Sequence, residues 1–199
     1  MKKISSIAAG LLLASSSVMA MDIQYFIGAG AEYSKSKVEG SGDGETDNFN
    51  GKDTTFKLKT GVILDKTNRI SISYSNPSDK TDFIYEDNNG DEVTGSVKSD
   101  VTLYLLNYDY FLPITQDFRL GIGAHLGSAE LELKSEGEKI SDRGLAYGAQ
   151  LSAIYDITKN VEFEIGISHT RYNVEIKEDD WTDELKHTNS VYTGINYKF

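Results

Sequence analysis

The last ten residues of the chain alternate between two kinds of side chain. Read back from the end, every second residue is apolar, aromatic or threonine: Phe199, Tyr197, Ile195, Thr193 and Val191. Successive side chains of a β-strand point to opposite faces, so this period of two predicts a strand with one apolar face. Such a face is an aggregation hazard in water. It is stable where it meets lipid and where the strand edges are paired.

The same alternation recurs upstream and predicts seven further strands. We expect the eight strands at 22–38, 54–64, 69–75, 101–112, 118–127, 145–157, 161–170 and 190–199. Each of them approaches the ten or so residues that a tilted strand needs to cross a bilayer. Phe26, Leu103 and Leu105 interrupt the otherwise polar phase of their strands.

The connections between these strands alternate in length. Short turns are predicted at 65–68, 113–117 and 158–160, and long polar connections at 39–53, 76–100, 134–143 and 175–187. In the connection 76–100 we expect the strands to extend beyond the membrane to a hairpin tip at 87–91. Short periplasmic turns and long external loops are typical of outer-membrane barrels. The sequence therefore predicts an all-β fold, an eight-stranded antiparallel up-and-down transmembrane β-barrel over residues 21–199. A secreted soluble barrel or sandwich, with its apolar face inward, is the alternative.

Residues 1–20 have the three parts of an export signal. Lys2 and Lys3 form a basic start, residues 4–14 an apolar core, and Val18-Met19-Ala20 a small-residue cleavage site. We therefore expect a signal peptide that is cleaved after Ala20. The chain has no cysteine, so neither disulfide nor thiol chemistry is expected.

Four motifs carry a resemblance to a known family. They are Tyr25-Phe26-Ile27-Gly28-Ala29-Gly30, Asn107-Tyr108-Asp109-Tyr110-Phe111, Gly121-Ile122-Gly123-Ala124 and the terminal Phe199. With these motifs, residues 22–199 resemble the small eight-stranded outer-membrane barrels of the OmpA, OmpX and opacity-protein group. The resemblance implies a bacterial outer-membrane location with both termini periplasmic. It also implies that Phe199, Tyr197 and Ile195 form the signal that the barrel-assembly machinery reads.

The inward phase of the predicted strands carries five acidic and four basic residues. They are Glu32, Lys57, Lys59, Asp109, Arg119, Asp156, Glu162, Glu164 and Lys198. Side chains alone can fill an eight-stranded barrel, so we expect a packed network of ion pairs in its lumen. The expected pairs are Glu32 with Lys57 or Lys59, Arg119 with Asp109 or Asp156, and Lys198 with Glu162. A narrow polar pore is the alternative.

The four predicted loops hold 21 acidic and 8 basic residues. A solvated surface that resists aggregation explains this excess. Attraction of divalent cations or of a basic extracellular partner is the functional alternative. Residues 87–92 match a calcium-binding loop only in part. Loops of this charge argue against nucleic-acid binding.

These observations predict an integral outer-membrane barrel with a structural or surface-interaction role. It would contact outer-membrane lipid and lipopolysaccharide, and it would need no cofactor or bound metal. A minor porin-like channel for small solutes is the alternative.

A lipid A-modifying enzyme is less favoured, because a nucleophilic serine and its histidine base must share a face. Ser168 and His169 are adjacent in a strand and so point to opposite sides. His125 faces inward, and His187 lies in a predicted loop. We therefore expect no enzymatic activity.

Overall fold

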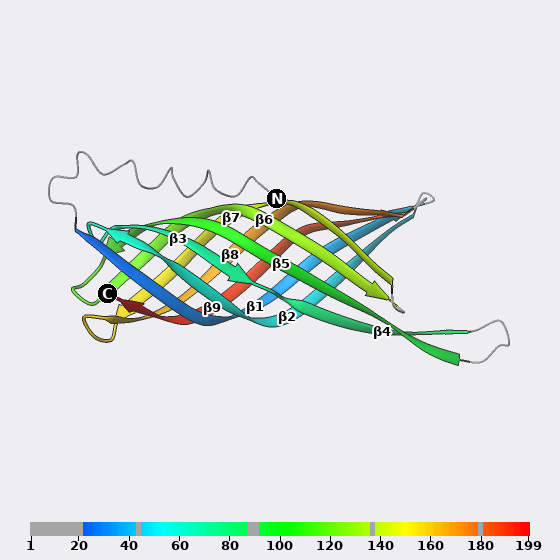
Figure 1. Ribbon diagram of the computed structural model, residues 1–199, viewed down its shortest axis with the longest axis horizontal. Helices are drawn as coiled ribbons and strands as arrows, with labels where there is room; N and C mark the ends of the chain where they lie inside the picture. The colour runs from blue at the N-terminus through cyan, green and yellow to red at the C-terminus, as the bar shows by residue number, and fades with distance from the viewer. Residues whose placement is uncertain (1–21, 43–44, 87–91, 136–137, 179–180) are drawn as a thin grey trace, which may run out of the picture.

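The computed structural model describes residues 22–42, 45–86, 92–135, 138–178 and 181–199, and these form nine antiparallel β-strands (Figure 1). The strands are β1 (Ile23–Gly42), β2 (Glu45–Leu64), β3 (Asn68–Ser75), β4 (Ser78–Glu86), β5 (Glu92–Pro113), β6 (Phe118–Ser135), β7 (Glu138–Asp156), β8 (Val161–Glu178) and β9 (Trp181–Lys198). Within these ranges, no helix is long and apolar enough to cross a membrane.

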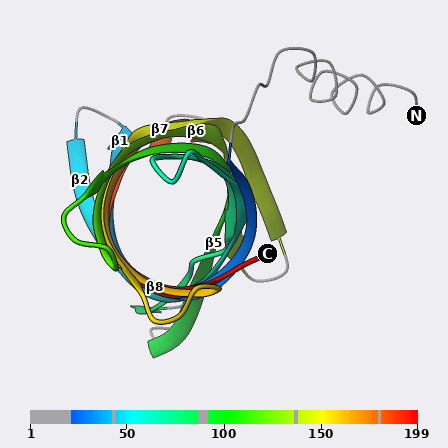
Figure 2. The ribbon, with the colours of Figure 1, turned by 90° about the vertical axis from the view of Figure 1, so that its left-hand side faces the viewer.

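The sheet closes on itself into a barrel. Its order is β3-β2-β1-β9-β8-β7-β6-β5-β4, and β3 also pairs with β5. The end-on view shows the resulting ring (Figure 2). β3 and β4 are successive parts of one pass, separated by Asn76 and Pro77, and both pair with β5. Nine strand segments therefore make eight passes, and the predicted eight-stranded antiparallel barrel is confirmed.

The short turns lie where the sequence predicts them. Asp65 and Lys66 have positive φ angles of 51° and 60°, the backbone of a tight hairpin turn. In the other two turns, the hydroxyls of Thr115 and Thr158 accept hydrogen bonds from the backbone at the start of the next strand. Phe199 donates its backbone N–H to Tyr25 O at 2.9 Å, so the last strand closes against the first at this end of the barrel.

The loops predicted at 39–53, 134–143 and 175–187 are wrong over most of their length, because the strands continue through them. In 76–100 the strands extend as expected, as β4 and the first part of β5. β1 and β2, for example, stay paired from Ile23 and Leu64 up to Gly42 and Glu45. The Gly, Asp and Asn content of these segments favours loops. In the structure, however, antiparallel pairing satisfies the hydrogen bonds of their backbone N–H and C=O groups whatever the side chains are. The hairpin centre predicted at 87–91 and the signal peptide predicted at 1–20 lie outside the described residues.

The outer wall of the barrel is apolar. Ile27, Leu58, Leu106 and Ile165 are each about half exposed there. Exposed aromatic residues lie toward both ends: Tyr25, Tyr110, Tyr155, Phe163, Tyr197 and Phe199 on the turn side, and Tyr33, Phe56, Tyr74, Tyr104 and Tyr147 on the other. Two aromatic belts around an apolar band suit the two interfaces of a bilayer. A soluble barrel would bury these side chains, so that alternative is wrong.

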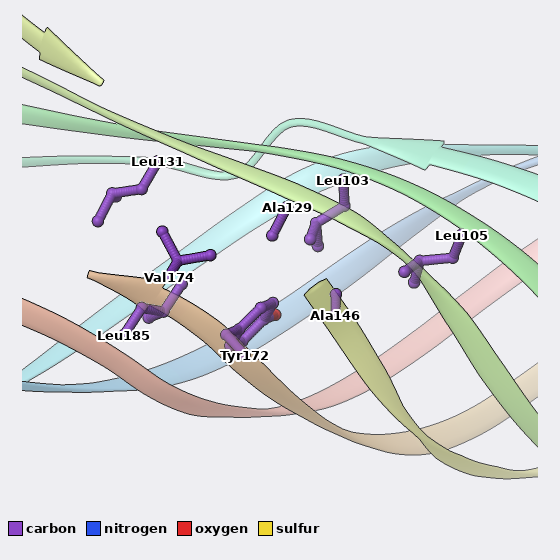
Figure 3. Packing of buried hydrophobic residues seen from close by; sticks show 8 residues of the cluster. All are labelled: Leu103, Leu105, Ala129, Leu131, Ala146, Tyr172, Val174 and Leu185. Carbon is purple, nitrogen blue, oxygen red and sulfur yellow. The ribbon is translucent and has the colours of Figure 1, made fainter. Parts of the chain in front are cut away.

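Two apolar clusters lie inside the barrel. Phe26, Ile63, Phe111 and Ile154 form the cluster near the short turns. The second is farther from the turns: Leu103, Leu105, Ala129, Leu131, Ala146, Tyr172, Val174 and Leu185 (Figure 3). The three residues that interrupted the alternation, Phe26, Leu103 and Leu105, are thus apolar members of the inward face rather than errors of phase.

Candidate functional site

All nine charged residues predicted for the lumen point inward and take part in ion pairs. Six are buried: Glu32, Asp109, Arg119, Glu162, Glu164 and Lys198. The side chains of Lys57, Lys59 and Asp156 keep exposed fractions of 11%, 10% and 19%. Alternation places them on the lumen side of seven different strands, so closure of the barrel is needed to bring these charges together.

The centre of this network is Arg69, a residue outside the predicted set. It lies on β3 and is fully buried. Its Nε donates to Asp109 Oδ2 at 2.9 Å. Its two terminal nitrogens donate to the two carboxylate oxygens of Glu164 at 2.8 Å each. A bidentate arginine–carboxylate pair is among the strongest polar contacts that side chains form.

A second group of charges lies beside the first. Arg119 Nη2 donates to Glu162 Oε2 at 2.7 Å and to Asp156 Oδ1 at 3.1 Å. Lys198 donates to the same Asp156 oxygen and lies 3.6 Å from Glu162. Asn196 joins the two groups, because its amide donates to Glu162 at 3.0 Å and to Glu164 at 2.9 Å.

The remaining two lysines are paired farther from the turns. Lys57 lies 2.8 Å from Glu32, and its Nζ is 4.8 Å from the centre of the Tyr192 ring. Lys59 donates to both oxygens of Glu164, at 2.9 and 2.8 Å. Glu164 therefore receives hydrogen bonds from both Lys59 and Arg69.

Most of the expected partners are adjacent in the structure. Glu32 pairs with Lys57, Arg119 with Asp156, and Lys198 with Glu162. Asp109 pairs with Arg69, its direct partner on the neighbouring strand, rather than with Arg119.

A signal for Arg69 was present in the sequence. Arg69 stands two, four and six residues before Ser71, Ser73 and Ser75, and alternation therefore places it on the same polar, inward face of the strand. The nine predicted residues also left one carboxylate in excess. Arg69 balances the network at five acids and five bases, so charge balance in a closed lumen would have identified it.

Glycines make room for these side chains. A Cβ built on Gly123 would meet Asp109 Oδ1, and one on Gly28 would meet Asn196 Oδ1. A void of only about 20 Å³ lies beside the network, next to Lys57 and Lys59. This void has room for about one water molecule, so side chains pack closely around Lys57 and Lys59.

The network is bounded on both sides by the apolar clusters. The Phe111 ring lies between two cations, with the guanidinium carbons of Arg69 and Arg119 at 4.8 and 4.9 Å from its centre. On the other side, His125 Nε2 is hydrogen-bonded to Thr170 Oγ1 at 3.0 Å. Among the described residues, His125 Nδ1, Ser71 Oγ and Ser152 Oγ are buried without a hydrogen-bond partner.

The residues proposed as an assembly signal lie on the outer wall. Phe199, Tyr197 and Ile195 are exposed by 70%, 48% and 46%. The rings of Phe199 and Tyr197 pack edge to face at 5.2 Å. Their strand, β9, is paired with β1 on one side and β8 on the other.

No serine–histidine pair suited to catalysis occurs among the described residues that the sequence singled out. Ser168 is buried inside, whereas His169 lies outside, with Nδ1 hydrogen-bonded to Asn189 Oδ1 at 2.8 Å. The described part of the chain contains no group of three or more His, Asp or Glu side chains that could hold a metal ion.

Comparisons with known proteins agree with this architecture. A family model described as outer membrane protein beta-barrel domain matches residues 6–199. No curated protein matches the chain. Among solved structures, Neisserial surface protein A superposes with a TM-score of 0.59 at 15% identity, covering 88% of this chain and 97% of that one. The N-terminal β-barrel domain of Pseudomonas aeruginosa OprF gives 0.52 at 12% identity, covering 89% and 97%. These likenesses concern the fold.

Proposed function

This chain belongs to the outer membrane protein β-barrel domain family, and we propose that it is a closed barrel with a structural or surface-interaction role. In this proposal the barrel carries no solute, and the strand extensions beyond the membrane present its functional surface. The chain is an outer-membrane protein; the closed lumen and the surface role are the proposed part.

The observation that carries the proposal is the sequence of layers inside the barrel. The cluster around Phe26 and Phe111 comes first, the charged network around Arg69 second, and the cluster around Leu103 and Leu185 third. A solute would have to displace apolar side chains twice and separate buried ion pairs once. Removing one member of a buried pair typically costs about 3–5 kcal/mol. Opening such a path by thermal motion would therefore be rare.

The surface role rests on the charge and length of the strand extensions. The segments 39–53, 76–100, 134–143 and 175–187 hold 21 acidic residues, and the strands run far into them. We propose that they face outward from the cell, with both termini periplasmic and the signal peptide removed after Ala20. Such a surface would attract divalent cations or a basic partner.

A minor pore is the second candidate. The observation in its favour is the set of buried polar atoms without partners, since His125 Nδ1 and the hydroxyls of Ser71 and Ser152 are suited to bind water. A chain of such waters would be a path for small ions. A lipid A-modifying enzyme is less favoured than either, because His169 is bonded to an asparagine and not to a serine.

Conductance in planar bilayers separates the closed barrel from the pore. The wild type should give no steady current, and the lipid-facing variant Leu126→Ala should behave identically. Combined removal of the Arg119 charge and of Leu103, by Arg119→Ala and Leu103→Ser, should produce current. Steady current from the wild type would refute the closed lumen.

The topology has its own test, made simple by the absence of natural cysteines. A cysteine at Asn50, exposed in the extension of β2, should react with an impermeant thiol reagent on intact cells. One at Lys159, in the short turn after β7, should react only after the outer membrane is opened. The opposite pattern would invert the proposed orientation.

A further inference from the structure

A groove of about 690 Å³ runs down the outer wall across β6–β9 and β1. Ala149 on β7 lines this groove, and its direct partner across β6 and β7 is the equally small Ala124. Ile122, Leu151, Ile167 and Val191 form its apolar sides. The small side chain of Ala149 therefore leaves space between the larger aliphatic side chains at the neighbouring positions.

A second, polar groove of about 410 Å³ adjoins the first on the side away from the short turns. The apolar and polar grooves meet between two successive outward-facing residue pairs of β1 and β9. Lys35 and Asn189 line the apolar groove, and the next outward pair, Lys37 and His187, lines the polar one. His187 is in turn opposite Arg171 on β8.

A β-bulge shapes the polar groove. The β1–β9 register shifts after Lys37, where Lys186 is the extra residue of β9, and the β8–β9 register shifts at the same level. Bulges redirect side chains at sites of this kind. Lys186 lies in this groove, 3.6 Å from Glu39 and 2.6 Å from Glu184.

The cations around the grooves are not balanced by the acids near them. Lys35 and Lys52 are directly opposite on β1 and β2, an arrangement that is unfavourable for like charges. Among the described residues, neither of them nor Arg171 has an ion-pair partner. Four cations, Lys35, Lys37, Arg171 and Lys186, therefore line grooves in which the described residues supply only two carboxylates, on a chain with a net charge of −11. A bound anion would relieve this repulsion.

The height of the grooves fits a lipid. Tyr33 and Tyr147, which belong to the belt of aromatic residues away from the turns, line the apolar and the polar groove respectively. That belt marks the level of the headgroups. The polar groove thus lies at the headgroups, and the apolar groove descends from it into the acyl-chain region.

We propose that the two grooves together bind one phosphorylated glycolipid of the outer leaflet, of the lipid A type. Its phosphate lies between Arg171, Lys37 and Lys35, where a guanidinium forms paired hydrogen bonds with phosphate oxygens. One of its acyl chains lies over Ala149. A zwitterionic phospholipid would bring its own ammonium group against these cations, and free phosphate would leave the apolar groove empty. The choice of leaflet rests on the proposed function.

Binding of purified, detergent-solubilised barrel to bisphosphorylated lipid A, followed by native mass spectrometry, tests the site. The wild type should bind it at least tenfold more tightly than dephosphorylated lipid A or phosphatidylcholine. The pair Lys35→Gln and Arg171→Gln should weaken lipid A binding by about tenfold or more, equivalent to about 1.4 kcal/mol. Ala149→Phe, which fills the apolar groove, should weaken it similarly.

Arg143→Gln is the matched control, because Arg143 is an exposed cation outside both grooves, paired with Glu130. It should bind lipid A as the wild type does. Heat-dependent gel mobility shows in each case that the variant is folded. Equal binding of all three lipids, or unchanged lipid A binding in the charge or groove variants, would overturn the proposal. Because this assay uses detergent, it is independent of the cysteine labelling that tests the orientation.

Discussion

Arg69 and Glu164 tie opposite walls of the barrel together. β3 and β8 are four strands apart in a ring of eight passes, yet two hydrogen bonds of 2.8 Å join the guanidinium to the carboxylate. A contact of this kind fixes the diameter of the barrel as well as balancing charge. It also makes the two residues sensitive probes of the lumen.

Arg69→Ala should lower the free energy of unfolding by about 3–5 kcal/mol, because it leaves Asp109 and Glu164 buried with less compensation. Urea unfolding in detergent or lipid measures this loss. A double-mutant cycle with Arg69→Met and Glu164→Gln should show strong coupling, since either change alone breaks the same pair. Additive losses would mean that the tie contributes little. Arg143→Ala, at an exposed pair, should leave the unfolding midpoint unchanged.

Arg119→Ala should cost less, about 1–3 kcal/mol, the range for hydrogen bonds to charged groups. Its two acceptors, Asp156 and Glu162, keep Lys198 as a second cation. Asp109 has no comparable substitute for Arg69, since its other polar contact is the neutral amide of Gln150. The same unfolding assay should therefore rank Arg69→Ala as the more damaging change. The reverse order would show that the two halves of the network are not organised as described.

The fold was largely predictable from the sequence, because lipid outside and a crowded lumen inside impose opposite demands on alternate residues. The strand lengths were not. Beyond the bilayer the outer face meets water, alternation loses its meaning, and residues such as Asp53 and Asn50 look like loop residues although they pair across β1 and β2.

Most charged residues of the lumen network were predictable from the sequence, whereas its central residue, Arg69, was not predicted. Alternation along each strand is enough to place Glu164 and Arg119 in the lumen. Which residues become partners depends on the stagger between strands around the barrel, which the sequence does not show. The sequence therefore left Arg119 with two possible partners, Asp109 and Asp156, and it did not predict that Asp109 pairs with Arg69. The lipid grooves depend on bulges and on paired alanines, which alternation does not reveal.

Gly123→Ala should destabilise the barrel by about 1–3 kcal/mol, the usual cost of overpacking. Its new methyl group would meet Asp109 Oδ1 and the backbone oxygen of Tyr108, the latter at 2.6 Å. Since the backbone oxygen cannot move freely, Asp109 would have to turn away from Arg69. The neighbouring change Ala124→Val points outward and should leave the unfolding midpoint nearly unchanged. If Gly123→Ala is equally silent, the lumen is less crowded than the contacts indicate.

Deletion of Phe199 should reduce the amount of folded barrel in the outer membrane. The residue contributes one backbone hydrogen bond, to Tyr25, and an exposed ring against Tyr197, so its loss costs the finished barrel little. A large fall in assembled protein would therefore reflect recognition before folding.

Phe199→Tyr should largely restore assembly, because it keeps the aromatic ring. Tyr155→Ala, at another exposed aromatic of the same belt, is the matched control and should assemble normally. Heat-dependent gel mobility of outer-membrane fractions measures all three. Equal losses for Tyr155→Ala and the deletion would mean that only the aromatic belt matters, and the proposed assembly signal would be wrong.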